Sequence, residues 1–252
     1  MPTPTQPPVT RLSRAFLRLF TVQGSWNYER LLGVGFGFAE EPLLRDLATD
    51  GEAHRAALAR GVRFFNSHPY LAGLAVGAAA RAEHDGVPPD QVERLRAALC
   101  GPLGSVGDRL VWAGWLPFAS GLALAAVALG AGWGAIGGFL VLYNVGHVAL
   151  RWWALRAGWA YGARVAAALH HPALAHAGRL TGPAMALAVG FALPLVTMFL
   201  GEGLATAWAW LLAAGVAAGA ILLLRWRPDR LSGLRVGLAL VAAALVGGWL
   251  WP

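Results

Sequence analysis

The sequence has no lysine, a single cysteine and few charged residues. Asp, Glu, Lys and Arg together form 13% of its 252 residues, and all 20 cations are arginine. An ordinary soluble domain carries about 25% charged residues. Cys100 has no second cysteine with which to form an intramolecular disulfide, and we expect it to pack as a small apolar side chain. These shortages exclude a disulfide scaffold, a disordered chain and a typical cytosolic enzyme.

Apolar residues dominate the chain instead. Hydrophobic side chains make up 57% of the residues and the mean hydropathy is +0.54, as in an integral membrane protein. No Asp, Glu, Lys or Arg occurs between residues 110 and 150, and a membrane-spanning helix needs about 20 apolar residues. The sequence therefore predicts an all-α integral membrane protein with a glycine-rich turn at 130–134. The expected transmembrane helices are at about 111–130, 134–150, 181–200, 204–224 and 236–251.

Arginine orients these expected helices. After residue 110 the chain has eight arginines and two acidic residues. The arginines fall in two linkers, one after the second expected span and one before the last. The positive-inside rule places both linkers in the cytoplasm. Membrane topology thus explains the net charge of +7, and we expect no nucleic-acid partner.

The first 109 residues are more polar and divide into two parts. Residues 1–23 form an amphipathic arm, with apolar and basic side chains on opposite faces of a helix: Leu12, Phe16, Leu19 and Phe20 against Arg11, Arg14 and Arg18. This arm either lies in the membrane interface or docks on a partner. Residues 24–109 are predicted to be helical with discontinuous or re-entrant segments. Pro69 suits the first turn of a helix that Ser67 or His68 caps.

Two polar clusters occur early in the chain. The first lies at residues 24–30 and contains an aromatic ring and three hydrogen-bonding side chains: Trp26, Asn27, Glu29 and Arg30. This set can stack on a sugar ring and bind its hydroxyls, and it also suits the start of an interfacial helix. The second lies at residues 64–70 and contains Asn66 and His68. A helix that begins just after His68 points free N–H groups at an oxygen-rich ligand, whereas His68 alone fits a capping role.

Two further clusters follow. Residues 101–108 are glycine-rich, which lets the backbone approach a ligand, but they lack the Gly-Lys-Ser/Thr ending of a phosphate-binding loop. Asp108 either caps the first membrane helix or is a functional carboxylate at the membrane edge. Asn144, His147 and Arg151 are spaced to share one helical face. That face is either an interhelical hydrogen-bond clamp or the wall of a polar cavity.

Other chemistry is not indicated by the sequence. His170, His171 and His176 lie in a basic linker without acidic neighbours, so no metal site is predicted. The patterns HExxH, GxSxG and CxxC do not occur. We therefore expect no metal, no other cofactor and no catalytic residue.

The four clusters together resemble the IID component of the mannose/fructose/sorbose-type phosphotransferase system (PTS). Members of that family carry Gly-Asn-Trp-Asn-Tyr-Glu-Arg-like, Phe-Phe-Asn-Thr-His-Pro-Tyr, Gly-Pro-Leu-x-Gly-Ile-Gly-Asp and Asn-x-x-His-x-x-x-Arg motifs in that order. Here these motifs correspond to residues 25–30, 64–70, 101–108 and 144–151. Four motifs in series make the resemblance specific, and it extends from the region of Arg11 to the C-terminus.

This resemblance implies a subunit of a sugar permease. In the family, IIC and IID subunits together form the pathway for a hexose such as mannose, glucose or fructose, in an oligomer of IIC–IID pairs. The phosphoryl group arrives on IIA and IIB proteins, or on a fused IIAB, and IIB phosphorylates the sugar at the cytoplasmic side. The chain would then be a multi-pass protein in the lipid bilayer of the bacterial cytoplasmic (inner) membrane, and not an enzyme by itself.

The resemblance also implies roles for individual residues. We expect six side chains to lie near the sugar path or the contact with IIC: Trp26, Asn27, Glu29, Asn66, His68 and Asp108. The secondary candidates are Arg30, Asn144, His147 and Arg151. Part of residues 24–80 should then enter the membrane. One alternative is a non-transporting membrane scaffold or regulatory protein derived from the same fold. Another is an independent membrane enzyme, which no catalytic cluster supports.

Overall fold

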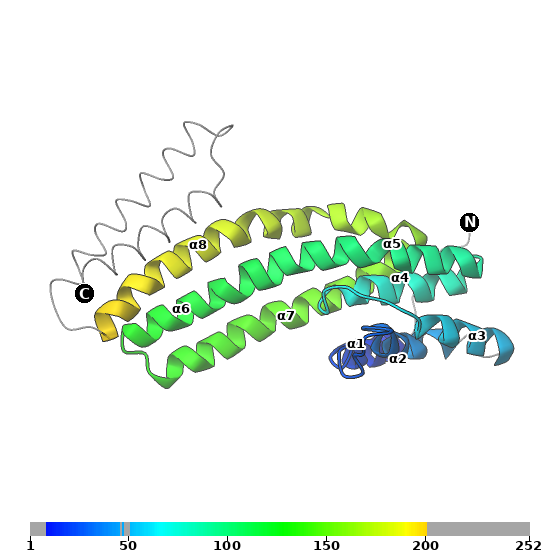
Figure 1. The fold of residues 1–252 in the computed structure, drawn as a ribbon, viewed down its shortest axis with the longest axis horizontal. Helices are drawn as coiled ribbons and strands as arrows, with labels where there is room; N and C mark the ends of the chain where they lie inside the picture. The colour runs from blue at the N-terminus through cyan, green and yellow to red at the C-terminus, as the bar shows by residue number, and fades with distance from the viewer. Residues whose placement is uncertain (1–8, 46, 48–50, 201–252) are drawn as a thin grey trace, which may run out of the picture. The chain divides into compact units, whose positions relative to one another are not determined.

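A computed structural model describes residues 9–45, 47 and 51–200, and these residues form a helical protein (Figure 1). Within them, the strand-like pairings are two isolated bridges, from Asn27 to Leu31 and from Leu31 to Phe65. The all-α fold class is therefore confirmed. The chain divides into two compact units, residues 1–192 and 193–252. The expected spans at 204–224 and 236–251 lie outside the described residues, as do the first eight residues of the arm.

Among the described residues, two helical stretches are long and apolar enough to cross a bilayer, Pro89–Ala128 and Trp133–Leu193. The first is a continuous run of three elements: α5 (Pro89–Gly107), the π-helical segment η2 (Asp108–Trp115) and α6 (Leu116–Ala128). The second contains α7 (Trp133–Tyr161), the 3₁₀ segment η3 (Gly162–His170) and most of α8 (Pro172–Leu200). Figure 1 shows α6, α7 and α8 running side by side.

The chain reverses between α6 and α7 at a glycine-rich turn. Gly130 and Gly132 adopt φ values of 88° and 52° there. This left-handed conformation favours glycine because glycine has no Cβ. The turn lies at the place expected from the sequence. The expected spans 111–130, 134–150 and 181–200 overlap these helices. Most of the helices begin before, or end after, the span that the sequence predicts.

Two charged residues lie within continuous helical stretches. Asp108 does not cap the start of a membrane helix, because α5 continues through it into η2 without a break. Arg151 lies inside α7 and not in a linker. No proline interrupts residues 133–161. A guanidinium does not end a helix by itself, because arginine has a high helix propensity.

The start of α4 (Ala72–His84) also differs from the expectation. The helix begins three residues after Pro69, and no side chain caps it. Pro69 lies instead in a turn in which the carbonyl of His68 accepts hydrogen bonds from the N–H groups of Leu71 and Ala72. This turn uses backbone atoms in place of the capping side chain that the sequence suggested.

The amphipathic arm packs on the chain's own core. Its helix α1 (Val9–Leu19) contacts α2 (Gly33–Leu44) and α7, and Ala15 and Leu19 are fully buried. An 11-residue helix is not stable alone in water, so its apolar stripe needs such a surface. The described part of the arm therefore buries Ala15 and Leu19 within the chain, whereas Phe20 is exposed. Whether the arm also contacts the membrane interface or a partner stays a prediction.

Helices α4 and α7 form the most extensive helix pair of the described residues. All of α4 from Ala72 to Ala80 is buried. Gly77 faces the backbone of α7 at Leu155, and Gly158 of α7 faces the backbone of α4 at Leu74. Small residues at a helix crossing allow such backbone contact. This crossing holds the loop before α4 beside the middle of α7.

Candidate functional site

The first two motifs lie side by side. Leu31 bridges to both Asn27 and Phe65. The N–H of Leu32 donates to the carbonyl oxygen of Phe65 at 2.9 Å, and the N–H of Phe65 donates to the carbonyl oxygen of Arg30 at 3.2 Å. These backbone bonds place Asn66 next to the loop that carries Trp26, Asn27 and Glu29.

Asn27 shapes its own loop. Its Oδ1 accepts hydrogen bonds from the N–H groups of Glu29 (3.1 Å) and Arg30 (2.9 Å), and its Nδ2 donates to the carbonyl of Ser25 (3.2 Å). This is the local side-chain-to-backbone bonding that forms Asx turns. The neighbouring rings of Trp26 and Tyr28 meet edge to face at 4.9 Å and remain exposed. The loop thus presents two aromatic rings and the exposed carboxylate of Glu29.

His68 joins the second motif to the third. Its side chain is 1% exposed and packs so closely on Gly107 that a Cβ there would overlap the ring. Nδ1 accepts a hydrogen bond from the N–H of Tyr70 at 3.2 Å. Nε2 is buried and has no hydrogen-bond partner within the described part of the chain. The ring of Trp112 lies 5.0 Å from the imidazole.

Tyr70 joins the second motif to the fourth. Its ring stacks on His147 with a centroid separation of 4.2 Å and an interplanar angle of 15°. Its hydroxyl lies 2.6 Å from that of Tyr143. The guanidinium of Arg151 lies 4.7 Å from the centre of the Tyr70 ring, within the range of a cation–π interaction. The second motif, η2 and α7 therefore meet at Tyr70.

Arg151 is buried and ties α7 to the end of α1. Its Nε donates to Nε2 of His147 at 2.8 Å, and one terminal nitrogen donates to the carbonyl oxygen of Leu19. The carbonyls at the end of a helix have no intrahelical partner, so this bond satisfies one of them. Asn144 differs from its two neighbours on the motif, because it is exposed and donates to the carbonyl of Leu140.

The ten candidate residues thus separate by exposure. His68 and Arg151 are buried, and Asn27 and His147 are partly buried. The others are exposed: Trp26, Glu29, Arg30, Asn66, Asp108 and Asn144. Sequence reasoning missed Tyr70, Tyr143 and Trp112 as members of the cluster. Tyr70 was inside a recognised motif, whereas Trp112 lies outside all four motifs.

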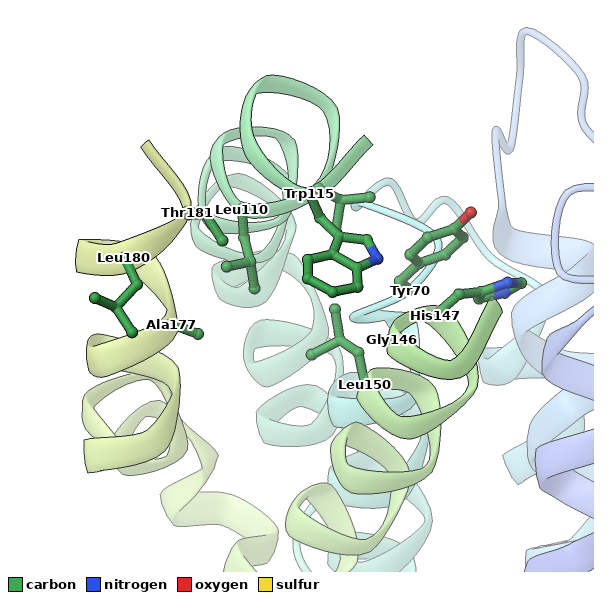
Figure 2. A pocket seen from close by; sticks show the side chains of 10 residues that line it. Tyr70, Leu110, Trp115, Gly146, His147, Leu150, Ala177, Leu180 and Thr181 are labelled. Atoms are coloured by element: carbon green, nitrogen blue, oxygen red, sulfur yellow. The ribbon is translucent and has the colours of Figure 1, made fainter. Parts of the chain in front are cut away.

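An apolar pocket of ≈ 310 Å³ lies beside this cluster (Figure 2). Its walls come from the loop before α4, η2, α7 and α8: Tyr70, Leu110, Val111, Trp115, Gly146, His147, Leu150, Ala177, Leu180 and Thr181. Gly146 allows the indole of Trp115 to lie against α7, where its Nε1 donates to the carbonyl of Tyr143 at 3.4 Å. Within the ranges that the structure describes, no group of three or more His, Cys, Asp or Glu residues is placed to hold a metal ion.

A separate charged cluster lies where α2, α3 (Gly51–Gly61), α4 and α5 meet. Glu40 (2% exposed) and Arg96 are buried there. Arg96 donates to the carbonyl oxygens of Arg60 and Gly61 and so satisfies the end of α3. Arg60 pairs with Glu83 of α4 at 2.6 Å. These bonds fix the short helices against α5.

Glu40 gives the fold a pH dependence. Burial raises the pKa of Glu40 from 4.5 to about 8, although Arg96 and Arg60 lower it, while Glu83 raises it further. Between these two values the folded chain keeps a proton that the unfolded chain has released, so stability falls as the pH rises through this window. We expect Glu40→Gln to flatten this fall and to raise Tm at pH 8. Thermal unfolding in detergent at a series of pH values measures it.

Glu41 supplies the control. Burial alone would raise its pKa, but hydrogen bonds from Arg45 and Arg18 outweigh burial and lower it. Its contribution to stability is present above pH 4.5 and is lost only as the pH falls below that value. Glu41→Gln should therefore leave the slope between pH 4.5 and 8 intact. An unchanged slope in Glu40→Gln would contradict the assignment.

Known proteins resemble the chain in sequence. A family model described as "PTS system mannose/fructose/sorbose family IID component" matches residues 9–189. The chain is 31% identical to the mannose-specific EIID component of Escherichia coli (strain K12) over 159 residues, or 58% of this chain and 54% of the relative. It is 34% identical to the sorbose-specific EIID component of Klebsiella pneumoniae over 158 residues, or 60% and 56%. The chain spans about half the length of the curated relatives it matches.

Solved structures share the fold. The cryo-EM structure of the mannose transporter ManYZ with microcin E492 contains a chain that matches with a TM-score of 0.58 and 21% identity, over 98% of both chains. A second solved membrane protein matches with a TM-score of 0.66 and 20% identity, again over 98% of both. All four motifs lie within the residues that the family model matches. The chain therefore belongs to the mannose/fructose/sorbose family of PTS IID components, membrane proteins of the sugar phosphotransferase system.

Proposed function

We propose that the chain, as the IID subunit of a mannose-type PTS permease, forms a hexose translocation pathway together with a IIC subunit. The observation that carries this proposal is the convergence of the four motifs. The motifs are far apart in sequence. The Leu31–Phe65 bridge joins the first motif to the second, the His68–Gly107 contact joins the second to the third, and the Tyr70–His147 stack joins the second to the fourth. The exposed motif residues thus form one surface, which the buried ones support. A shared site explains why residues so far apart in the chain are brought together.

The exposed members of the motifs are the ones that can meet a sugar. Glu29, Asn66 and Asp108 present carboxylate or amide groups for hydroxyls, and Trp26, 48% exposed, offers a ring face. Asn27 acts differently, because its amide already binds the backbone of its own loop. We assign it, with the buried His68, to positioning these groups.

Phosphorylation is assigned to other proteins. An incoming phosphohistidine has to reach its acceptor, and His68 is 1% exposed and enclosed by Gly107 and aromatic rings. We therefore propose that IIA and IIB carry the phosphoryl group and that IIB phosphorylates the hexose at the cytoplasmic side of the bacterial inner membrane. The solved relative is described as the mannose transporter ManYZ, which supports a IIC partner. An oligomer of IIC–IID pairs is part of the same proposal.

Complementation tests this proposal. A host strain without its own mannose-type permease would receive the IIC, IIA and IIB genes with or without this chain. We expect labelled hexose uptake only when the chain is present, and co-purification of the chain with IIC. Uptake that does not depend on the chain would contradict the transport role. Co-purification without any uptake would instead favour a non-transporting scaffold.

A further inference from the structure

The pocket beside Tyr70 does not suit a sugar. Figure 2 shows the rings of Tyr70 and Trp115 and the side chain of Leu150 between helices, with Ala177 and Leu180 on α8 across the gap. The polar atoms of these rings already have partners: the Tyr70 hydroxyl meets Tyr143, and the Trp115 indole donates to the Tyr143 carbonyl. A hexose needs hydrogen bonds for its hydroxyls, because unpaired polar groups are costly in an apolar site.

An apolar pocket of this size calls for an apolar occupant. A cavity of ≈ 310 Å³ destabilises the fold if it stays empty, and water gains little in it because water needs several polar partners. Apart from Tyr70, the walls belong to the stretches that are long and apolar enough to cross a bilayer. Leu180 forms part of the wall and is 54% exposed, so the pocket is accessible from the side of a stretch that is long and apolar enough to cross a bilayer.

On two of the helices that line the pocket, an arginine directly precedes a pocket residue. Arg109 directly precedes Leu110 on η2, and Arg179 directly precedes Leu180 on α8. Both arginines are exposed, whereas Asp108 adds one negative charge at the same level. Exposed arginines on membrane helices attract anionic lipid head groups, and the planar guanidinium suits phosphate.

We propose that this pocket binds one acyl chain of an anionic phospholipid whose head group lies at the level of Arg109 and Arg179. The acyl chain packs against the faces of Tyr70 and His147 and so supports the stack that joins the second and fourth motifs. The pocket lining contains none of the exposed polar groups assigned to the sugar. It therefore does not depend on the proposed transport role.

Lipid photo-crosslinking tests this site. The full chain, with its partners, is kept in membranes that contain phosphatidylglycerol or phosphatidylcholine carrying a diazirine in one acyl chain. We expect adducts on peptides from η2 and α8, with more adduct from phosphatidylglycerol. Ala177→Phe fills the pocket and should lower this labelling about tenfold. The control Ala149→Phe, at an exposed position on α7, should leave it unchanged.

Further variants separate a folding defect from a loss of lipid binding and test the two arginines. If Ala177→Phe does not yield folded protein, Ala177→Leu fills part of the pocket and should lower the labelling to an intermediate degree. Arg109→Gln with Arg179→Gln should reduce the yield from phosphatidylglycerol to that from phosphatidylcholine. Equal labelling in the Ala177 and Ala149 variants would overturn the proposal. A photoreactive residue at Leu180 that crosslinks to a partner subunit or to residues 201–252, in place of lipid, would also overturn it.

Discussion

Gly158→Ala should prevent the chain from folding. A Cβ at Gly158 would overlap the backbone of Leu74 in α4, and Gly77 on the opposite helix makes the same close approach to Leu155. Backbone atoms cannot rotate away as a flexible side chain can, so the α4–α7 crossing would have to separate. Overpacking in a core typically costs about 1–3 kcal/mol, and we expect this position to exceed that range. The amount of monodisperse protein after detergent extraction, together with its Tm, measures the effect.

Gly138 is the matched control on the same helix. A Cβ at Gly138 meets nothing within 4 Å. Replacing a helical glycine by alanine without a clash stabilises a helix by roughly 0.5–1 kcal/mol. Gly138→Ala should therefore keep or raise Tm, while Gly158→Ala abolishes the transition. Equal stability of the two variants would show that α4 and α7 do not pack through their backbones.

Gly107→Ala should uncouple the second motif from the third. The added Cβ would overlap the His68 side chain, which is fully buried between Tyr70 and Trp112 and cannot move aside. We expect the loss of most hexose uptake together with a lower Tm, measured on the same membranes. The effect is large because the clash displaces the ring that supports the loop with Asn66.

Two comparisons separate this clash from a general effect of alanine. Gly104→Ala changes the same helix at a site with nothing within 4 Å, and it should be neutral. In the double variant Gly107→Ala with His68→Gly, both the Cβ and the ring that overlap the added methyl group are gone, so Tm should recover relative to Gly107→Ala alone. Strictly additive losses in this cycle would contradict a direct contact between the two residues.

The helical class could be predicted because hydropathy depends only on composition and run length. The uncharged stretch from 110 to 150 indicated two helices and a glycine turn, and the structure has a turn at Gly130–Gly132. Helix ends were harder to predict. Charge suggested that α7 would stop before Arg151, but the helix continues because the guanidinium finds Leu19 and His147 as partners. Tertiary contacts of this kind are not visible in one sequence.

The site was predictable in its segments but not in the roles of its residues. The motifs indicated which parts of the chain would matter, since polar residues are rare among so many apolar ones. Exposure could not be inferred, so the buried His68 and the exposed Asn66 had equal standing as sugar ligands. The central position of Tyr70 arises from stacking across α7, a contact over a long sequence separation. The burial of His68 and the local hydrogen bonds of Asn27 are why we propose positioning roles for these two residues.

Labelled hexose uptake by Asn66→Ala and Asp108→Ala tests whether the exposed motif residues bind the transported sugar. Both side chains are exposed, so their removal should leave folding intact. The loss of a hydrogen bond to a bound sugar lowers uptake about tenfold or more when the lost protein group is charged or rigidly positioned. Ser105→Ala, an exposed neighbour in the third motif, is the control. With equal amounts of each variant in the membrane, the account predicts a strong loss in the first two and wild-type uptake in the control. Wild-type uptake in both Asn66→Ala and Asp108→Ala would contradict it.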